Sequence, residues 1–176
     1  MRFDKHQYVC LYVLELLKQR KPMKIKSLFE DVNVVSVIAS AERAITHALT
    51  LEQDRTGGYF CLADLDGIPL FLCKIGDVLN RERGEKYFCN AKEKCRRLGT
   101  SGYTLASESR DYAKEKYAGA VKGSNYIYGF SGLPEYLDEA AMLVCASWDC
   151  DIEREDAKRL AKKSQNPYWD RMVHFL

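Results

Sequence analysis

Residues 117–132 read YAGAVKGSNYIYGFSG and decide the fold of this chain. Two short runs rich in aromatic and β-branched residues, 117–121 and 126–130, flank a Lys-Gly-Ser-Asn segment, and its Gly-Ser-Asn centre can adopt the positive φ angles of a tight turn. We therefore expect an antiparallel hairpin. The following residues 133–139 contain a proline and three carboxylates, which favour the first turn of a helix.

A second hairpin is predicted earlier in the chain. Strands over 59–65 and 68–75 flank Asp66-Gly67, a strong turn signal, and both strands are apolar on both faces, as is typical of a covered sheet. Apolar residues at helical spacing predict the surrounding helices, at 34–49, 82–98, 137–148 and 152–164. This order predicts an α+β fold with four antiparallel strands in one sheet and helices over its faces.

Three stretches of the chain are expected to differ in role. Residues 1–33 form a helical extension with a basic cluster from Lys18 to Lys26, which we interpret as a solvated helix end rather than a phosphate-binding patch. Residues 34–150 form the α+β domain. Residues 151–176 add a helix and an aromatic tail that either docks on the domain or mediates association.

Composition excludes several classes of protein. The 176 residues carry a net charge of only +2, so no general attraction to nucleic acid or to a membrane surface is expected. The start of the chain lacks the pattern of a signal peptide, and no segment is expected to span a bilayer, so we expect a cytoplasmic protein. The seven cysteines lack zinc-site spacing and are interpreted as buried thiols. A contact of Cys61 with Cys73 across the first hairpin is conceivable.

Several motifs within 34–148 have the order and turns of one known family. Residues 62–67 match a turn of the form Val-Asp-x-x-Gly, and residues 90–95 match an Ala-x-x-Lys-Ala segment. The closing hairpin ends in Gly129-Phe-Ser-Gly132 and is followed by Asp138-Glu-Ala140, in place of Gly-Val-Ser-Gly and Asp-Glu-Ala. In these features the chain resembles the GlcG/HbpS-like family, whose members are haem-binding and corrinoid-associated and include the C-terminal domain of one class of cobalamin adenosyltransferases. It departs from the family before the third strand, where Lys116 to Ala120 replace a Gly-Gly-Val-Pro run.

The resemblance implies a profilin-like sheet, self-association, and a small-molecule ligand such as haem or another tetrapyrrole, including a corrinoid. We expect a cofactor to be bound by six residues, which are His47, Lys92, Gly129, Ser131, Gly132 and Asp138. His47 is the histidine we favour as a ligand over His6 and His174, which lie near the termini. The turn at 129–132 offers backbone amides at a helix start, although its glycines equally serve to turn a strand into a helix.

No catalytic or metal-binding constellation is recognisable in the sequence, so we predict a non-enzymatic binding or sensing module that acts as an oligomer. Two alternatives stay open. A winged-helix nucleic-acid binder fits three helices followed by a hairpin, but the third helix offers one firmly basic exposed residue, Arg43, so a nucleic-acid partner is not expected. An enzyme that uses Asp64, Lys92 or Asp138 as acid or base is the other alternative.

Overall fold

The computed structural model describes residues 34–78 and 80–175, so the expectations for the 1–33 extension lie outside the described residues. The chain divides into two compact units between Val35 and Ser36. The second unit contains every strand described below.

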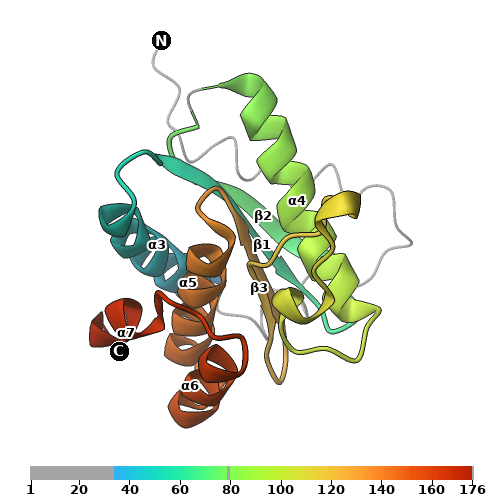
Figure 1. The fold of residues 1–176 in the computed structure, drawn as a ribbon, viewed down its shortest axis with the longest axis vertical. Coiled ribbons are helices and arrows are strands. Elements are labelled where there is room, and N and C mark those ends of the chain that lie inside the picture. Colours follow the sequence, from blue (N-terminus) through green and yellow to red (C-terminus); the bar gives the residue numbers. More distant parts are fainter. Residues whose placement is uncertain (1–33, 79, 176) are drawn as a thin grey trace. The chain divides into compact units, whose positions relative to one another are not determined.

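One four-stranded antiparallel sheet forms the centre of this unit (Figure 1). Its strands are β1 (Gly57–Ala63), β2 (Pro69–Gly76), β3 (Ala120–Lys122) and β4 (Ile127–Ser131), in the order β2-β1-β4-β3. The two hairpins join through β1 and β4, where Phe60 pairs with Phe130. This confirms the predicted sheet. Strand β3 is shorter than the predicted run 117–121, because the backbone turns at Gly119, with a φ of 112°.

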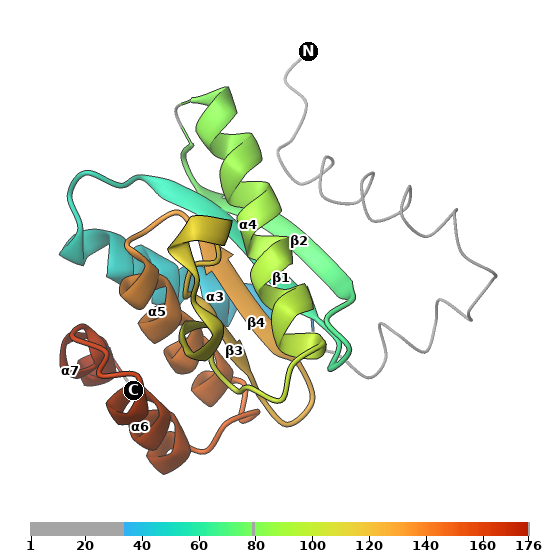
Figure 2. The ribbon, with the colours of Figure 1, turned by 45° about the vertical axis from the view of Figure 1, so that its right-hand side comes forward.

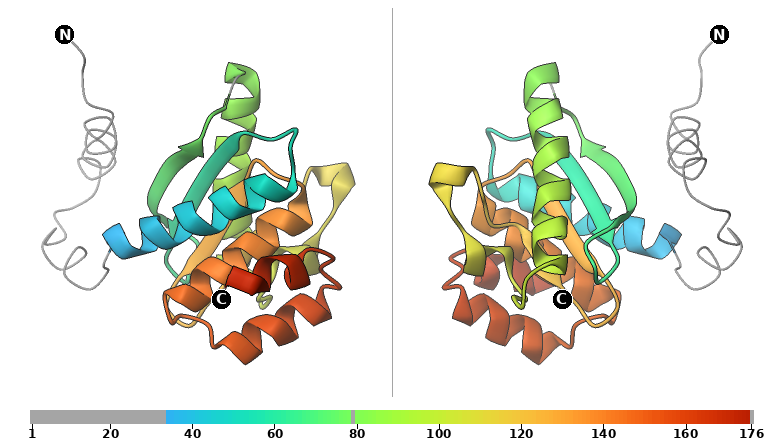
Figure 3. Two further views of the ribbon diagram at one scale, coloured as in Figure 1. Left: turned by 90° about the vertical axis from the view of Figure 1, so that its left-hand side faces the viewer. Right: turned by 90° about the vertical axis from the view of Figure 1, so that its right-hand side faces the viewer.

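Helices cover both faces of the sheet (Figure 3). Helix α4 (Arg81–Gly99) lies on one face, and α3 (Val34–Leu51) and α5 (Glu135–Trp148) lie on the other. Helices α6 (Arg154–Lys163) and α7 (Trp169–Met172) pack against α5. Between α4 and β3, the segment 100–119 contains the short helices η1 (Ala106–Ser109) and η2 (Tyr112–Lys114), and η3 (Val173–Phe175) follows α7. Figure 2 shows segment 100–119, in olive to gold, passing the β3 side of the sheet.

Side chains of different size line the two faces of the sheet. Under α4 the fully buried ones are small or slender: Cys61, Ala63, Ala120 and Ile127 pack with Ala91, Cys95 and Leu98 of the helix, and the larger Tyr59 and Leu72 are partly buried beside them. Because neighbouring residues in a strand point to opposite faces, Phe60, Leu62, Tyr128 and Phe130 fill the space under α3 and α5. The small face lets α4 approach the strands closely.

Helix α3 is long and apolar enough by composition to cross a membrane, contrary to our expectation that no segment would be. Core helices of soluble proteins meet the same criterion. Five residues of α3 are buried in the domain, namely Val37, Ala41, Ala44, Ile45 and Ala48. These positions form one buried stripe of α3, whose other residues are partly buried or exposed.

The structure tests the prediction that the cysteines are buried thiols. All six described cysteines are free thiols, of which Cys61, Cys95 and Cys145 are buried as predicted, whereas Cys89 and Cys150 are exposed. Burial, with smaller contributions from Cys61 and Glu42, raises the pKa of Cys73 to about 12.

In the C-terminal tail, Trp169 and Met172 are buried, so this part of the chain docks on the domain.

Candidate functional site

A buried ion pair joins the two helical layers. The ammonium group of Lys94 in α4 lies 2.9 Å from Oδ2 of Asp138 in α5 and donates a hydrogen bond of 2.7 Å to the carbonyl oxygen of Phe130. The other carboxylate oxygen of Asp138 accepts the backbone N–H of Leu133 at 2.9 Å. Both charged side chains are only 2% exposed. Every strong hydrogen-bonding group of this pair is therefore occupied within the protein.

The short edge strand explains how side chains from opposite faces of the sheet can meet. Gly119 directly precedes β3, and a Cβ atom there would lie 2.6 Å from Lys94 Nζ and 2.6 Å from the Cβ of Asp138. The absence of a side chain at Gly119 thus makes room for the pair at the end of the strand. Lys94, Gly119 and Asp138 form one structural unit, which we call the cross-sheet pair.

Burial dominates the electrostatics of this unit. Removal from water raises the pKa of Asp138 to about 7, against the opposing effects of Lys94, the Leu133 N–H group and the more distant Arg55. An ion pair taken out of water gains stability only if its geometry is good and its remaining polar atoms are bonded, as they are here. Because neither group reaches solvent, this pair links the layers and offers no surface to a substrate.

Sequence analysis missed Lys94 and singled out Lys92 instead. The structure places Lys92 on the exposed side of α4, with its ammonium group 5.0 Å from the ring centre of Phe88. Two signals pointed to Lys94. It lies three residues after Ala91 and one before Cys95, on the buried stripe, and this spacing matches the Ala-x-x-Lys-Ala segment better than Lys92 does.

The predicted cofactor residues do not gather around one ligand. His47 of α3 contacts the carbonyl oxygen of Arg171 at 3.3 Å, on the face of the sheet opposite to Lys92. Gly129, Ser131 and Gly132 are buried in or beside β4, and Ser131 is paired with Tyr59. The structure does bring Asp138 to this turn, but the carboxylate of Asp138 itself occupies the Leu133 N–H group. The Leu133 N–H group is therefore not available to bind an external anion.

The neighbouring carboxylates of α5 hold segment 100–119. Glu135 forms an ion pair of 3.1 Å with Arg110 and accepts the N–H group of Ala118 at 2.9 Å. Burial opposes ionisation of Glu135, but hydrogen bonds from Tyr112, Ala118 and Arg110 outweigh it and lower its pKa. From α4, Arg97 donates to the carbonyl oxygens of Ala106 and Ser109. Charged groups on both helices thus fix this irregular segment.

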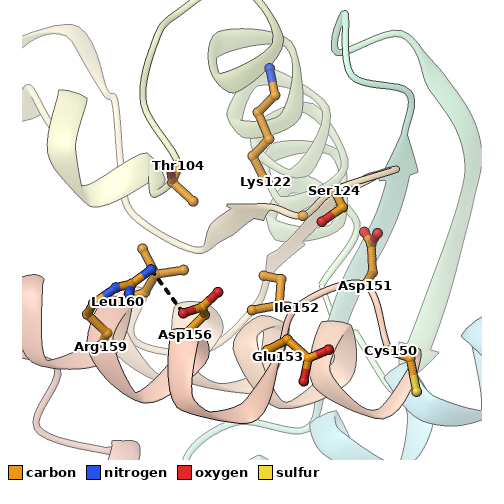
Figure 4. Close-up of a pocket in the computed structure, with 11 residues that line it drawn as sticks. Thr104, Lys122, Ser124, Cys150, Asp151, Ile152, Glu153, Asp156, Arg159 and Leu160 are labelled. Carbon is orange, nitrogen blue, oxygen red and sulfur yellow. Dashed lines mark ion pairs between the residues drawn. The ribbon is translucent and has the colours of Figure 1, made fainter.

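A hollow of about 290 Å³ lies between the β3–β4 turn and α6 (Figure 4). Charges of both signs and several polar or apolar side chains line it, among them Thr104, Lys122, Ser124, Asp151, Ile152, Glu153, Asp156, Arg159 and Leu160. In Figure 4 the ammonium group of Lys122 points away from the floor of the hollow, whereas Arg159 and Asp156 face each other beside it.

One buried carboxylate shapes the wall of the hollow. Asp151 is 4% exposed and accepts the backbone N–H and the side-chain amide of Asn125, both at 2.7 Å, and the N–H group of Tyr126 at 3.1 Å. These bonds fix the β3–β4 turn against the loop that follows α5. On the opposite wall Arg159 and Asp156 form an ion pair of 2.9 Å. Asp151 thus fixes one wall, whereas the Arg159 side chain on the other wall is 77% exposed.

The architecture places the chain in the α+β class, with helices over both faces of an antiparallel sheet. Comparisons with protein-family models, with curated proteins and with solved structures find no match to this chain.

Proposed function

We propose that this chain is a non-enzymatic module that binds a small polar molecule in the hollow between the β3–β4 turn and α6. One observation carries the proposal: cationic and anionic side chains line the same concave surface. A zwitterion, such as a free amino acid, can satisfy both signs. Its carboxylate suits Arg159 and its ammonium group suits Asp156 or Glu153, after exchange with the existing Arg159–Asp156 pair.

The size of the hollow favours a ligand smaller than a tetrapyrrole. Its volume of about 290 Å³ is just below the range of ligand pockets, which typically span about 300–1,000 Å³. Haem and corrinoids, which the family resemblance implies, therefore need a different surface, such as one shared between copies of the chain. We also propose that the chain self-associates and is located in the cytoplasm.

Two observations weigh against the alternatives. An enzyme that used Asp138 would need it to reach a substrate, and this carboxylate is sealed and bound to Lys94. A winged helix needs a protruding hairpin, whereas β1 is an inner strand of the sheet. The binding module needs neither feature.

The test is a titration of the isotopically labelled protein with each of the common amino acids, followed by backbone amide NMR. We expect at least one amino acid to shift the signals of Ser124, Asp151 and Ile152 in a saturable manner, and Arg159→Gln to weaken that binding. Lys92→Gln, which removes an exposed cation elsewhere, is the matched control. If no amino acid shifts these signals, the zwitterion proposal fails. A parallel absorbance scan with haemin and cobalamin then decides the tetrapyrrole version, because a shifted Soret band requires binding.

A further inference from the structure

Glu139 is a buried carboxyl group without a cationic partner. It follows Asp138 in α5 and is 0% exposed. Oε2 accepts one long hydrogen bond of 3.4 Å from the Ser107 N–H group, and Oε1 has no partner. Among the residues that the structure describes, no ion pair involves Glu139. An ionised carboxylate in such a place is so costly that the group takes up a proton instead.

The polar groups around Glu139 are uncharged and can bond to either form of the acid. The side chains of Ser107, Ser164 and Asn166 lie near its carboxyl group, and the buried hydroxyl oxygen of Ser107 also has no partner. A proton on Oε1 would give this oxygen a hydrogen to donate, and hydroxyl oxygens can accept it. One proton therefore supplies the missing hydrogen bond and removes the uncompensated charge.

The location of Glu139 connects it to the hollow. Ser107 belongs to η1, and the segment that leads into η1 contributes Thr104 to the lining. Ser164 and Asn166 follow α6, which contributes Asp156, Arg159 and Leu160. Glu139 does not line the hollow itself, but it lies near the two segments that carry these lining residues. At the surface the same two segments are also joined, by the ion pair of Glu108 with Lys163.

We propose that Glu139 is a proton-operated latch, whose neutral carboxyl group holds η1 against the residues that follow α6 and whose ionisation loosens these walls of the hollow. The regulatory part of this inference rests on the proposed binding function, whereas the latch itself does not. Burial raises the pKa of Glu139 above its ordinary range, and the nearby hydrogen-bonding groups only partly offset this effect. The folded protein therefore holds this proton more tightly than the unfolded chain, and the latch weakens as the pH rises through the folded-state value.

Other charged groups on the packed elements already have partners or face solvent. On η1, α4, α5 and α6 the pairs are Glu108 with Lys163, Arg97 with Glu93, Glu135 with Arg110, and Asp138 with Lys94, whereas Lys92, Arg96, Arg154 and Lys162 are exposed. Those on α7, Asp170 and Arg171, are exposed. Asp138 titrates in a separate environment beside Lys94, so the substitution of Glu139 alone identifies the latch.

The direct test is a carboxyl-carbon NMR titration of the full chain, with the Glu139 signal assigned by its loss in Glu139→Gln. We expect a midpoint clearly above the ordinary glutamate value of about 4.3. A midpoint at the ordinary value overturns the latch. Because Gln has the shape of a neutral acid and keeps one donor and one acceptor, Glu139→Gln should fold as stably as the native chain below the ordinary glutamate value of about 4.3. From there up to the folded-state midpoint its stability advantage should grow, and above the midpoint it should stay constant.

A second measurement follows the walls themselves. The backbone amides of residues 104–109 should lose protection against hydrogen exchange in the native chain as the pH rises past the midpoint, after correction for the intrinsic pH dependence of exchange. In Glu139→Gln their protection should not change with pH in this way. Glu108→Gln is the control: it removes the surface ion pair, so it should lower protection while keeping the pH dependence. Equal pH dependence in the native chain and Glu139→Gln overturns the proposal. Neither measurement uses a ligand, so failure of every amino acid to bind would reject the proposed function and leave the latch standing.

Discussion

The face of the sheet under α4 is lined by small apolar side chains, whereas the first turn of α5 is lined by carboxylates. Under α4 the contact is close and non-directional: a Cβ atom at Gly129 would lie 2.5 Å from the Cys95 sulfur atom. At α5, Glu135, Asp138 and Glu139 each hold a different part of the molecule through directed polar contacts. Both helices bury apolar side chains, but at the start of α5 directed polar contacts add attachments to segment 100–119 and to α4.

The largest expected effect comes from breaking the cross-sheet pair on one side. Lys94→Ala leaves the Asp138 carboxylate buried without its cation, which should lower the free energy of unfolding by about 3–5 kcal/mol. Urea denaturation at pH 8 measures the change. The double variant Lys94→Met/Asp138→Asn removes both charges and keeps an acceptor for Leu133, so it should recover much of the loss. Lys92→Ala, two residues away and exposed, should have little effect; a loss as large as that of Lys94→Ala would contradict the comparison.

The apolar region should respond to volume instead of charge. Gly129→Ala introduces a Cβ atom in contact with Cys95, and such overpacking should cost about 1–3 kcal/mol. Because the clash is with the sulfur atom, Cys95→Ala in the same chain should relieve part of it. A double-mutant cycle by urea denaturation measures this coupling. Additive losses in the two variants would show that the close approach of α4 does not depend on this contact.

The pH dependence of stability sharpens the difference between the regions. The pKa of Asp138 is raised by burial to about 7 in the folded state, from an ordinary value of 3.8. The folded protein therefore binds more protons than the unfolded chain between these values, and its stability should fall as the pH rises from 4 to 7, by at most about 1.4 kcal/mol per pH unit from this group. Denaturant midpoints across this range test it. In Lys94→Met/Asp138→Asn the stability should depend less steeply on pH. If the slope is the same as in the native chain, the pH dependence of stability comes from Glu139 and other groups.

The smallest effect is expected at the solvent-facing edge of the charged region. Arg110 pairs with Glu135 while its own side chain is 29% exposed, so Arg110→Gln should cost about 0–1 kcal/mol and less at high salt. Thermal unfolding at low and high ionic strength measures this difference. The stability loss caused by Lys94→Ala should be almost the same at low and high ionic strength, because salt screens the buried pair of the native chain poorly.

Local patterns predicted the elements of this fold well. The two hairpins, the helices and the antiparallel sheet follow from turn residues and apolar spacing, and the structure confirms them. The start of β3 was not predicted, because the residues before it have high β-propensity but leave the ladder where the backbone turns at Gly119, and Ala118 bonds to Glu135 instead. A partner 17 residues away leaves no trace in the local pattern.

The sites were less accessible to sequence analysis. Asp138 was expected at a functional position, but its contact is Lys94, and His47 and Lys92 lie on opposite faces of the sheet. The hollow was not anticipated, since its walls come from Thr104, the 122–124 turn and residues 150–160. The sequence of each segment, taken alone, does not predict that these segments lie next to one another.

By itself, the sequence determined the secondary structure and the faces that must be buried, because turns, capping and apolar periodicity act over a few residues. Only the tertiary structure decided which charges meet. Lys94 and Asp138 lie 44 residues apart and on opposite faces of the sheet, and they come together because Gly119 leaves space at the end of β3. Glu139 acquires its unusual environment in the same way, since burial depends on what the rest of the chain places around a side chain.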